Sequence, residues 1–464
     1  MPDVDAMRRV ASEKGLRLRA MAKEKVSIIV LGHVDADGMA SVGLMARALA
    51  ANGAIFTARA VPDVNLRMLH EMASEGFDFH VFCEVGSGHL KDIEAALGGK
   101  YMLIDHHQLT EEERESPNVF NVNAFGVDGS RELSGAGATY MLARNMVDDA
   151  KPMSWLSVVG ALGDRQDRGS KHTLIGMNEQ LAAEAISSGY LDISEDLLLF
   201  GRSVRPLHES IAMTFDPYIQ GLTGNKDACL AALTSAGLLI KDSSRWRVAA
   251  ELTPDEKEKL LATLSPYLDI SGADSSAVWG TTYLLKREDE RSYLRDARDF
   301  ASLLDATGRM GKAGLGIAIC LGDRGAMLTD AERTLLEYRN AIMRHLRVLL
   351  SDEERISQDG QMVQLVGDGI VQENMTGAVS NALSGMPQLR GKMILLRTIT
   401  KSGEIKFSIR KGLGSQSKVN LGQVMLQSAA FVGGNGGGHD SAAGARIPAV
   451  KADIFYEKLK SGLR

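Results

Sequence analysis

Residues 32–38 of this 464-residue chain read GHVDADG and could ligate a divalent metal ion. His33, Asp35 and Asp37 alternate at a spacing of two, so in an extended turn their side chains can point the same way. Gly38 then permits a sharp bend in the backbone. An imidazole with two carboxylates suits manganese and, by ligand type alone, equally zinc or iron. Taken alone, the segment is equally consistent with a polar turn that ends in a capping Asp.

Two further segments carry the same residue types. In LIDHHQ, Asp105 precedes the adjacent histidines His106 and His107 directly after an apolar run. One histidine of such a pair can bind metal while its neighbour faces substrate, and a nearby carboxylate can fix the imidazole tautomer. In VVGALGDRQDRG, Asp164 ends an apolar segment and Asp167 follows one turn later.

Each segment has an ordinary structural explanation, such as an exposed polar loop or a helix cap. The chain has only ten histidines, however, and four of them lie in Gly- or Asp-rich motifs: His33, His106, His107 and His439. Independent structural explanations for all of these together are improbable, so the combination predicts a metal site.

The elements around these residues predict an α/β domain with a mainly parallel sheet, because short apolar runs alternate with helical patterns. We expect strands at 26–31, 55–59, 79–83, 102–104 and 119–122, and helices at 39–51 and 135–147. The polar residues fall just after three of these strands, and Glu84 follows the third of the five. Since the carboxyl ends of parallel strands line one crevice, these side chains can converge there.

The pattern changes after about residue 205, which predicts three domains: residues 1–205, an inserted domain over 206–325, and residues 326–464. Part of the insert reads as helix, short strand and helix. We favour a structural or partner-binding insert over a winged helix that reads nucleic acid. The helical stretch that follows reads as a connecting helix, with Thr329 as its N-cap and Glu332 three residues on.

The last hundred residues return to α/β character. Strands are expected in MVQLVGDG and MILLRTIT, and a turn at 401–403 leads into IKFSIRKG as a hairpin partner. In the Gly-rich run GGNGGGHDSAAGA, Gly437 and Gly438 let backbone amides approach a phosphate closely because no side chain intervenes. A mobile loop is the alternative.

Two groups of basic residues could follow a single-strand backbone along the crevice, although a solvated surface explains them equally well. They are Arg165, Arg168 and Lys171 in the first domain, and Arg390, Lys392, Arg397, Lys401, Lys406, Arg410 and Lys411 in the last.

The composition is that of a folded globular protein, and we expect it to reside in a reducing cytoplasm. Net charge is −6, which argues against tight non-specific binding of duplexes but leaves room for a local basic groove. No apolar run reaches the roughly 20 residues that a membrane span needs. The N-terminus lacks a secretory signal, and the three cysteines are scattered.

With these motifs together, the chain resembles the DHH phosphoesterase superfamily, whose name describes the Asp-His-His at 105–107. The similarity runs nearly end to end: GHVDADG, FCEVGSG, LIDHH, SGAG, GDRQD and GGGHDSAAGA. Within the superfamily it is most similar to archaeal RecJ-type proteins, including the GINS-associated nuclease, through FGRSVRPLHES, DPYIQGLTG, LRDARDFASLLDATGRMGKAG and IAICLGDRG.

The resemblance implies two divalent metal ions, Mn²⁺ first and Mg²⁺ as the alternative. His33 and Asp35 would hold one ion, Asp37, His106 and Asp164 the other, and the residue at 84 would bridge them. His107 would face the scissile phosphate, and Asp105 would orient a ligand histidine. In the second domain, Ser408, Arg410 and His439 would contact phosphates.

One position departs from the family pattern, which has Asp where this chain has Glu84. A bridging carboxylate one methylene longer shifts the ions or its own backbone by about 1 Å, and a misplacement of that size can cost about 10²-fold in rate. Glu still ligates metal, so reduced or altered activity is expected rather than its loss.

Three functions follow from these features. The leading one is a single-strand exonuclease that acts on DNA, RNA or both in replication or repair. The second is a replisome scaffold that binds GINS and the replicative helicase with little catalysis, which the insert and Glu84 favour. The third is a phosphodiesterase for oligoribonucleotides or cyclic dinucleotides, against which the insert argues.

Overall fold

A computed structural model of the chain describes residues 2–463. By their internal contacts the residues form two compact units. Among the described residues, the first contains 2–196 and 281–336, and the second contains 197–280 and 337–463. The predicted metal ligands all lie in the first unit.

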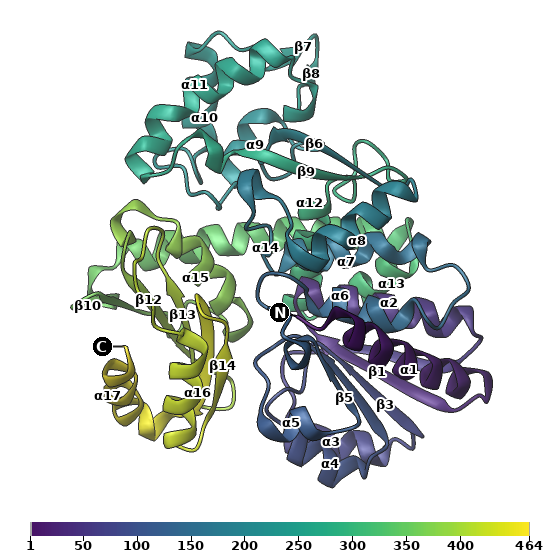
Figure 1. The fold of residues 1–464 in the computed structure, drawn as a ribbon. Helices are drawn as coiled ribbons and strands as arrows, with labels where there is room; N and C mark the ends of the chain where they lie inside the picture. The colour runs from purple at the N-terminus through teal and green to yellow at the C-terminus, as the bar shows by residue number, and fades with distance from the viewer. Residues whose placement is uncertain (1, 464) are drawn as a thin grey trace. The chain divides into compact units, whose positions relative to one another are not determined.

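The first unit contains a five-stranded parallel sheet of order β2-β1-β3-β4-β5. Strands β1, β3, β4 and β5 are largely buried, as parallel strands covered on both faces should be, whereas the edge strand β2 is partly exposed. Helices α3 and α4 cover one face, and α1, α2 and α6 lie on the other (Figure 1). The bounds are β1 Ser27–His33, β2 Ile55–Val61, β3 Phe79–Cys83, β4 Tyr101–Asp105, β5 Val119–Asn121, α1 Val4–Lys23, α2 Ala36–Ala51, α3 Leu66–Ser74, α4 Leu90–Leu97, α5 Glu111–Glu115 and α6 Gly135–Ala143.

Further helices pack on α2 from outside the sheet. Helix α7 contacts α2 and α6, α8 contacts α7, and α12 and α13 contact α2. The last two come from the chain after residue 280, so part of the predicted insert packs on the first unit. The predicted end of the inserted domain at residue 325 remains a prediction. The bounds are α7 Ser154–Gly163, α8 Gly176–Ser187, α12 Ala297–Arg309 and α13 Ala313–Leu321.

Strands β6 (Leu191–Leu197) and β9 (Trp279–Leu285) pair where the chain leaves for the insert and returns from it. The Leu198 amide donates to the Val278 carbonyl at 2.8 Å, so the two ends of the insert lie side by side. Between them are α9 Leu207–Met213, α10 Lys226–Ser235, β7 Lys241–Asp242, β8 Arg245–Trp246 and α11 Pro254–Ser271, and the three helices share one apolar core.

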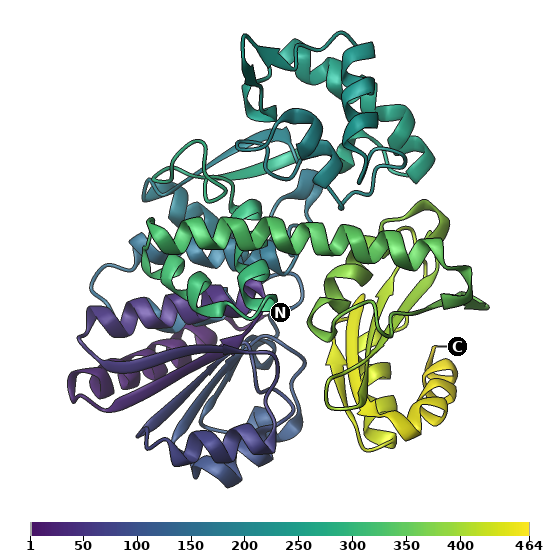
Figure 2. The ribbon, with the colours of Figure 1, turned by 180° about the vertical axis from the view of Figure 1, so that it is seen from behind.

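Helix α14 (Ala326–Ser351) runs from the first unit into the second (Figure 2). The prediction that Thr329 caps this helix is wrong. The helix begins three residues earlier, and the Thr329 hydroxyl donates to the Gly325 carbonyl at 3.4 Å. In the second unit, Arg339 of α14 lies 3.5 Å from the Phe200 ring centroid, which anchors this half of the helix on the insert.

The C-terminal domain has a mixed six-stranded sheet of order β10-β11-β12-β13-β15-β14. Helix α15 contacts β12 and β13, while α16 and α17 share an apolar core with β13 and β15. The predicted hairpin of MILLRTIT and IKFSIRKG is the antiparallel pair β12–β13. The bounds are β10 Ile356–Asp359, β11 Met362–Val366, β12 Met393–Ile399, β13 Glu404–Lys411, β14 Asn435–Gly438, β15 Ala442–Pro448, α15 Thr376–Ser384, α16 Leu421–Phe431 and α17 Ala452–Gly462.

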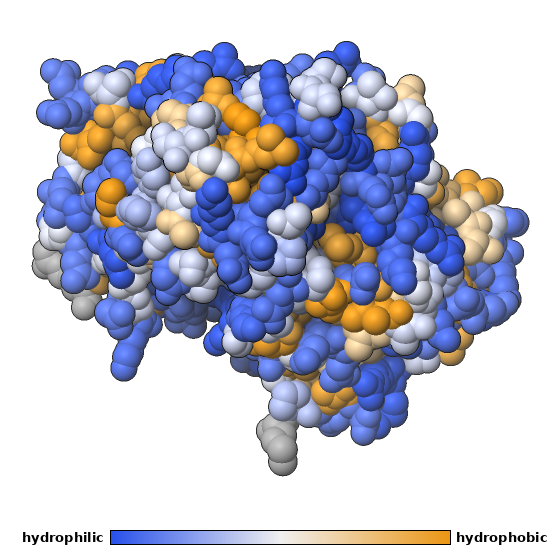
Figure 3. Space-filling view, turned by 90° about the horizontal axis from the view of Figure 1, so that it is seen from above, coloured by the Kyte–Doolittle hydropathy of each residue, from blue (hydrophilic) through white to orange (hydrophobic). Residues whose placement is uncertain are grey.

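The predicted fold class is confirmed, and the five expected strands are present with their ends shifted by a few residues. Among residues 2–463, none of the helices combines the length and apolar character needed to cross a bilayer. In Figure 3, hydrophilic residues cover most of the visible face and hydrophobic residues occur in separate small groups.

The buried His80 on β3 predicts how stability depends on pH. Its Nδ1 lies 3.2 Å from the Lys100 carbonyl, and burial lowers the pKa of this imidazole. The unfolded chain binds the His80 proton at about pH 6.5, so stability falls as pH drops below that value until the folded imidazole also protonates. We expect His80→Gln to lose less free energy of unfolding between about pH 7 and 5.5 than the native chain.

Urea unfolding at each pH measures this difference, with the exposed His70→Gln as the matched control. Parallel pH profiles for the native chain and His80→Gln would contradict the prediction.

Candidate metal centre

The predicted ligands of the first unit lie at the carboxyl edge of the parallel sheet or on helices beside it. His33 ends β1, Glu84 follows β3, and Asp105 ends β4 with His106 directly after it. Asp37 lies in the first turn of α2, and Asp164 follows the last residue of α7. The fold therefore brings all six predicted ligands together.

One group of ligand atoms comes from His33, Asp35 and Glu84, whose atoms lie within 4.8 Å of one another. His33 Nδ1 is 2.6 Å from Asp35 Oδ2 and 3.6 Å from Glu84 Oε2. Asp35 also caps α2, because its Oδ1 accepts a hydrogen bond from the Gly38 amide at 3.0 Å. The capping and metal interpretations of this residue are compatible, since each uses a different oxygen.

The second group contains Asp37, His106 and Asp164, again within 4.8 Å. His106 Nδ1 lies 2.6 Å from the Gly129 carbonyl, which can only accept, so the proton is on Nδ1. In the neutral ring Nε2 then carries the lone pair, and this atom lies 3.6 Å from Asp37 Oδ2. The Gly135 and Ala136 amides, at the start of α6, donate to Asp37 at 2.6 and 2.9 Å and fix its orientation.

Glu84 lies between the two groups. Its Oε2 faces His33, and its Oε1 is 3.8 Å from His106 Nε2. Oε2 is buried and accepts no hydrogen bond from the residues that the structure describes, although an unpaired buried carboxylate oxygen is costly. The donor set and this unpaired oxygen fit a pair of divalent cations that share Glu84.

The charges also indicate that a cation belongs here. Burial raises the pKa of Glu84 well above its ordinary value, and the Asp35 carboxylate adds to the shift. Burial raises the pKa of Asp37 to about 6, although His106 opposes the shift. Burial would also raise the pKa of Asp35, yet the His33 imidazole and the Arg309 guanidinium lower it overall. Without added positive charge, this many carboxylates cannot all ionise together.

Asp105 and His107 form a separate pair beside the ligands. Asp105 accepts from His107 Nδ1 at 2.7 Å and from Ser87 Oγ at 2.6 Å. We expected Asp105 to orient a ligand histidine, but its carboxylate holds the ring of His107, whereas the Gly129 carbonyl holds that of His106. Desolvation opposes the charged form of His107, yet Asp105 raises the pKa of His107 to about 9.

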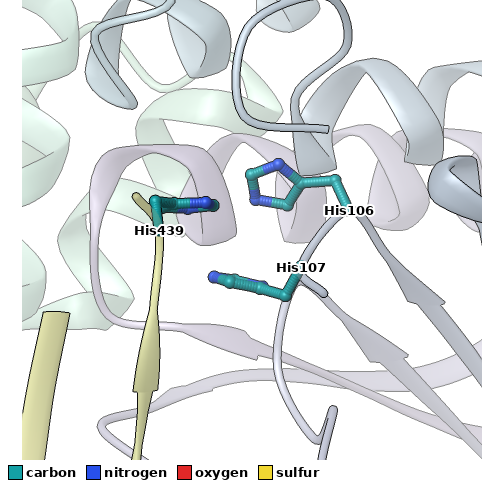
Figure 4. Close-up of side chains that lie close together, drawn as sticks. All are labelled: His106, His107 and His439. Atoms are coloured by element: carbon teal, nitrogen blue, oxygen red, sulfur yellow. The ribbon is translucent and has the colours of Figure 1, made fainter. Parts of the chain in front are cut away.

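The two histidines differ in their access to solvent. Figure 4 shows both leaving the segment after β4 with rings tilted against each other, and their centroids lie 4.6 Å apart. The side chain of His106 is 0% exposed and that of His107 is 31% exposed. His107 therefore lies on the open side of the centre, which is compatible with the predicted contact to a phosphate.

The motif analysis missed several residues that shape the centre. A Cβ at Gly135 would lie 2.5 Å from Glu84 Cγ, and one at Gly160 would lie 2.4 Å from Asp37 Oδ1. Buried Gln166 donates to Asp164 Oδ2 at 2.7 Å and accepts from Asn178 Nδ2 at 2.6 Å. The SGAG and GDRQD motifs contain two of these residues, but only contacts across the fold reveal their roles.

The predicted phosphate-binding residues lie in the second unit. Arg410 donates to Ser408 Oγ at 3.1 Å and is fixed by Asn381, whose Oδ1 lies 2.5 Å from its Nε. Ser408 is only 4% exposed, so its hydroxyl supports Arg410 in this conformation. His439 directly follows β14 (Figure 4).

The glycine run forms strand β14, paired with β15, rather than a mobile loop. A Cβ at Gly436 would lie 2.7 Å from the Met425 carbonyl, and one at Gly438 would lie 2.5 Å from the Ala442 carbonyl. A Cβ at Gly437 would meet no described atom within 4 Å. Packing therefore explains two of the glycines, and Gly437 faces open space.

Several of the basic residues already have acidic partners. Arg397 pairs with Asp368 at 2.9 Å, Lys411 with Asp440 at 2.8 Å and Lys171 with Glu195 at 2.8 Å. A nucleic-acid backbone would have to compete with these carboxylates, which weakens the predicted basic path.

Three family models match the chain, in consecutive segments. The N-terminal domain of the DHH family matches residues 27–160, the DHH-CID domain matches residues 199–278, and the DHHA1 domain matches residues 359–463. The first match contains five of the six predicted ligands, and the third contains the predicted phosphate-binding residues.

One curated relative and two solved structures extend over most of the chain. An uncharacterized protein of Methanocaldococcus jannaschii is 27% identical over 93% of this chain and 92% of its own length. CDC45 from Entamoeba histolytica is 13% identical with a TM-score of 0.65, covering 98% of this chain and 99% of that protein. RecJ from Thermus thermophilus, solved in complex with Mn²⁺, is 16% identical with a TM-score of 0.57. That match covers 97% of this chain but only 54% of RecJ, so the chain spans about half of RecJ's length.

Gly135 provides a test of the centre that leaves every ligand in place. We expect Gly135→Ala to weaken Mn²⁺ binding at least tenfold, because the new methyl group displaces Glu84 and Asp37. Overpacking of this kind typically costs about 1–3 kcal/mol of stability, so the variant should still fold. Calorimetric Mn²⁺ titration and thermal unfolding measure the two effects.

Gly314→Ala is the matched control, since a Cβ there meets no described atom within 4 Å and the residue lies on helix α13. Equal Mn²⁺ affinities for Gly135→Ala and Gly314→Ala would show that the close approach at Gly135 has no bearing on metal binding.

Proposed function

Since this chain belongs to the DHH superfamily and has a RecJ-like fold, we propose that it is a metal-dependent phosphodiesterase that degrades single-stranded DNA or RNA from an end. The observation that carries this proposal is the pair of ligand groups at the edge of the sheet, with Glu84 in one group and its Oε1 3.8 Å from His106 of the other. The expected setting is DNA replication or repair.

The proposed metal ligands are His33 and Asp35 for one ion and Asp37, His106 and Asp164 for the other, with Glu84 between them. Two divalent ions in such a site would activate water and neutralise charge on the phosphate during an in-line displacement. Mn²⁺ is the proposed ion, with Mg²⁺ as the alternative, and the Mn²⁺ complex of RecJ supports this choice.

His107 would act on the substrate through Nε2. Asp105 holds its Nδ1 proton and raises the pKa of the ring to about 9, which favours its charged form. A charged, partly exposed imidazole can donate a strong hydrogen bond to a non-bridging phosphate oxygen. Asp105 is then the residue that keeps this donor oriented and charged.

The C-terminal domain would bind the phosphates that flank the reacting one. Arg410, fixed by Asn381, can bind two phosphate oxygens at once, and Gly437 offers an unobstructed backbone. His439 would add a third contact, and Ser408 would hold Arg410 in place.

A second function is favoured by one observation on Glu84. Its backbone has φ of +58°, a conformation that costs a non-glycine residue about 1–2 kcal/mol, and its side chain is one methylene longer than the family's Asp. A centre of this kind can retain metal and yet catalyse slowly. The chain would then serve mainly as a replisome scaffold that binds GINS and the replicative helicase, and the insert is the proposed docking site.

A degradation assay separates these functions. We expect the native chain with Mn²⁺ to shorten end-labelled single-stranded DNA or RNA, and Glu84→Asp to change the rate by up to about 10²-fold. Asp105→Ala/His106→Ala should abolish the activity, because the double variant loses a ligand and the residue that orients His107.

The outcomes of the assay discriminate between the functions. If the native chain is inert while Glu84→Asp is active, the exonuclease proposal fails and the scaffold proposal is favoured. Activity confined to dinucleotides would indicate the small-substrate phosphodiesterase instead. Activity that survives in the double variant would refute the assignment of the metal centre.

The proposed partner contact can be tested by removing the insert at its paired ends. Residues 199–277 can be replaced by a short Gly/Ser linker, because residues 198 and 278 are already hydrogen-bonded to each other. We expect the shortened chain to keep Mn²⁺ binding and to lose GINS in a pull-down assay. Undiminished GINS capture would place the partner contact elsewhere.

A further inference from the structure

The segment that follows the proposed ligand Asp164 is held in a strained conformation. Within residues 164–173, three non-glycine residues have positive φ: Arg165 at +57°, Lys171 at +55° and His172 at +58°. Such residues keep this conformation only where their surroundings enforce it. The position of Asp164 therefore depends on what holds this segment.

Part of the support comes from neighbouring elements of the same domain. Gln166 donates to Asp164 Oδ2 at 2.7 Å and to the Gly129 carbonyl at 2.8 Å. Lys171 pairs with Glu195 at 2.8 Å on the exposed side. These contacts fix Gln166 and Lys171, but none of them involves Asp167.

Asp167 is held by a residue that lies 131 positions later in the chain. Arg298, in the first turn of α12, donates to Asp167 Oδ2 from Nε at 3.1 Å and from Nη2 at 2.8 Å. It also donates from Nη1 to the Thr281 carbonyl at 2.6 Å and from Nη2 to the His172 carbonyl at 3.2 Å. A single guanidinium thus contacts the middle of the strained segment at Asp167, its far end at His172, and strand β9 at Thr281.

A second contact comes from the same returning part of the chain. The Tyr283 hydroxyl accepts a hydrogen bond from the Leu174 amide at 2.7 Å, and Arg298 lies 5.5 Å from the Tyr283 ring centroid. The ion pair is mostly buried, with 23% of the Arg298 side chain and 16% of the Asp167 side chain exposed. Loss of either partner would leave the other charge buried and unpaired.

We propose that Arg298 is a positioning residue for the metal centre, which acts through Asp167 to hold Asp164 at the site of the second ion. This inference rests on the proposed two-metal function. It adds that the segment after the insert, which contains Arg298 on α12, is required to complete one of the two ion sites. His33 and Asp35, the proposed ligands of the other ion, have no hydrogen bond to the 164–173 segment among those described, so Arg298 should affect the two sites unequally.

The test is Mn²⁺ titration of the full-length protein by calorimetry and electron paramagnetic resonance. The variants are Arg298→Gln, Arg298→Lys, Asp167→Asn and Arg298→Gln/Asp167→Asn. Arg324→Gln is the matched control, because Arg324 also forms a bidentate pair, with Glu288, in the same unit away from the ligands. His33→Ala serves as a background in which only the second ion site remains intact.

We expect the native chain to bind two Mn²⁺ ions and Arg298→Gln to bind one of them about 10–100-fold more weakly, as when residues that orient a ligand are removed. The loss should persist in the His33→Ala background and be no larger in the Arg298→Gln/Asp167→Asn double variant. Arg298→Lys should recover only part of it, because a lysine cannot make all four hydrogen bonds.

Other results would overturn the inference. Unchanged binding of both ions, or equal weakening of both, would show that Arg298 serves general stability alone. If Arg298→Gln does not fold, Asp167→Asn keeps the size of the side chain and decides the question by the same criteria. A native chain that binds no Mn²⁺ would instead refute the proposed function itself.

Discussion

The structure depends on the electrostatic cost of gathering acidic groups at one buried edge of the sheet. Five carboxylates converge there with three histidines: Asp35, Asp37, Glu84, Asp105 and Asp164 with His33, His106 and His107. Two like charges about 4 Å apart repel by about 4 kcal/mol at an effective dielectric constant of 20. The histidines, the backbone amides of α6 and the proposed cations are the means by which the fold offsets this repulsion.

That constraint explains why the smallest residues surround the centre. Carboxylates can approach backbone amides and one another only where no side chain intervenes, and Gly38, Gly135 and Gly160 supply that space. Glu84, whose φ is positive, belongs to the same arrangement, since its carboxylate oxygens lie near His33 on one side and His106 on the other. The contacts of the Glu84 carboxylate to both ligand groups thus offset the strain in its backbone.

The sequence was sufficient for the sheet and for the residues at its edge. Apolar runs followed directly by His, Asp or Glu predicted both the strands and the convergence of their ends. Gln166, Gly135 and Arg298 were not predictable in this way, because their roles arise from contacts between segments far apart in the chain. Thr329 was misjudged because its sequence suits a cap, whereas the helix begins earlier, at Ala326.

Asp105 shows a further limit of motif reasoning. The motif predicts that its carboxylate serves a histidine, but two adjacent histidines offer two choices. Gly129 decides between them by holding His106, which leaves His107 to Asp105. A backbone carbonyl leaves no signature in a sequence.

The pairing of Asp167 with Arg298 has a consequence for how the protein is made. All six proposed ligands are synthesised by residue 164, yet Arg298, which binds Asp167 beside the last of them, is synthesised only after residues 199–278. A nascent chain on the ribosome would therefore hold its ligands in an unfinished cluster while the insert is translated. Tight metal binding would then occur late in synthesis, only after the part of the chain that follows the insert has packed against the 164–173 segment.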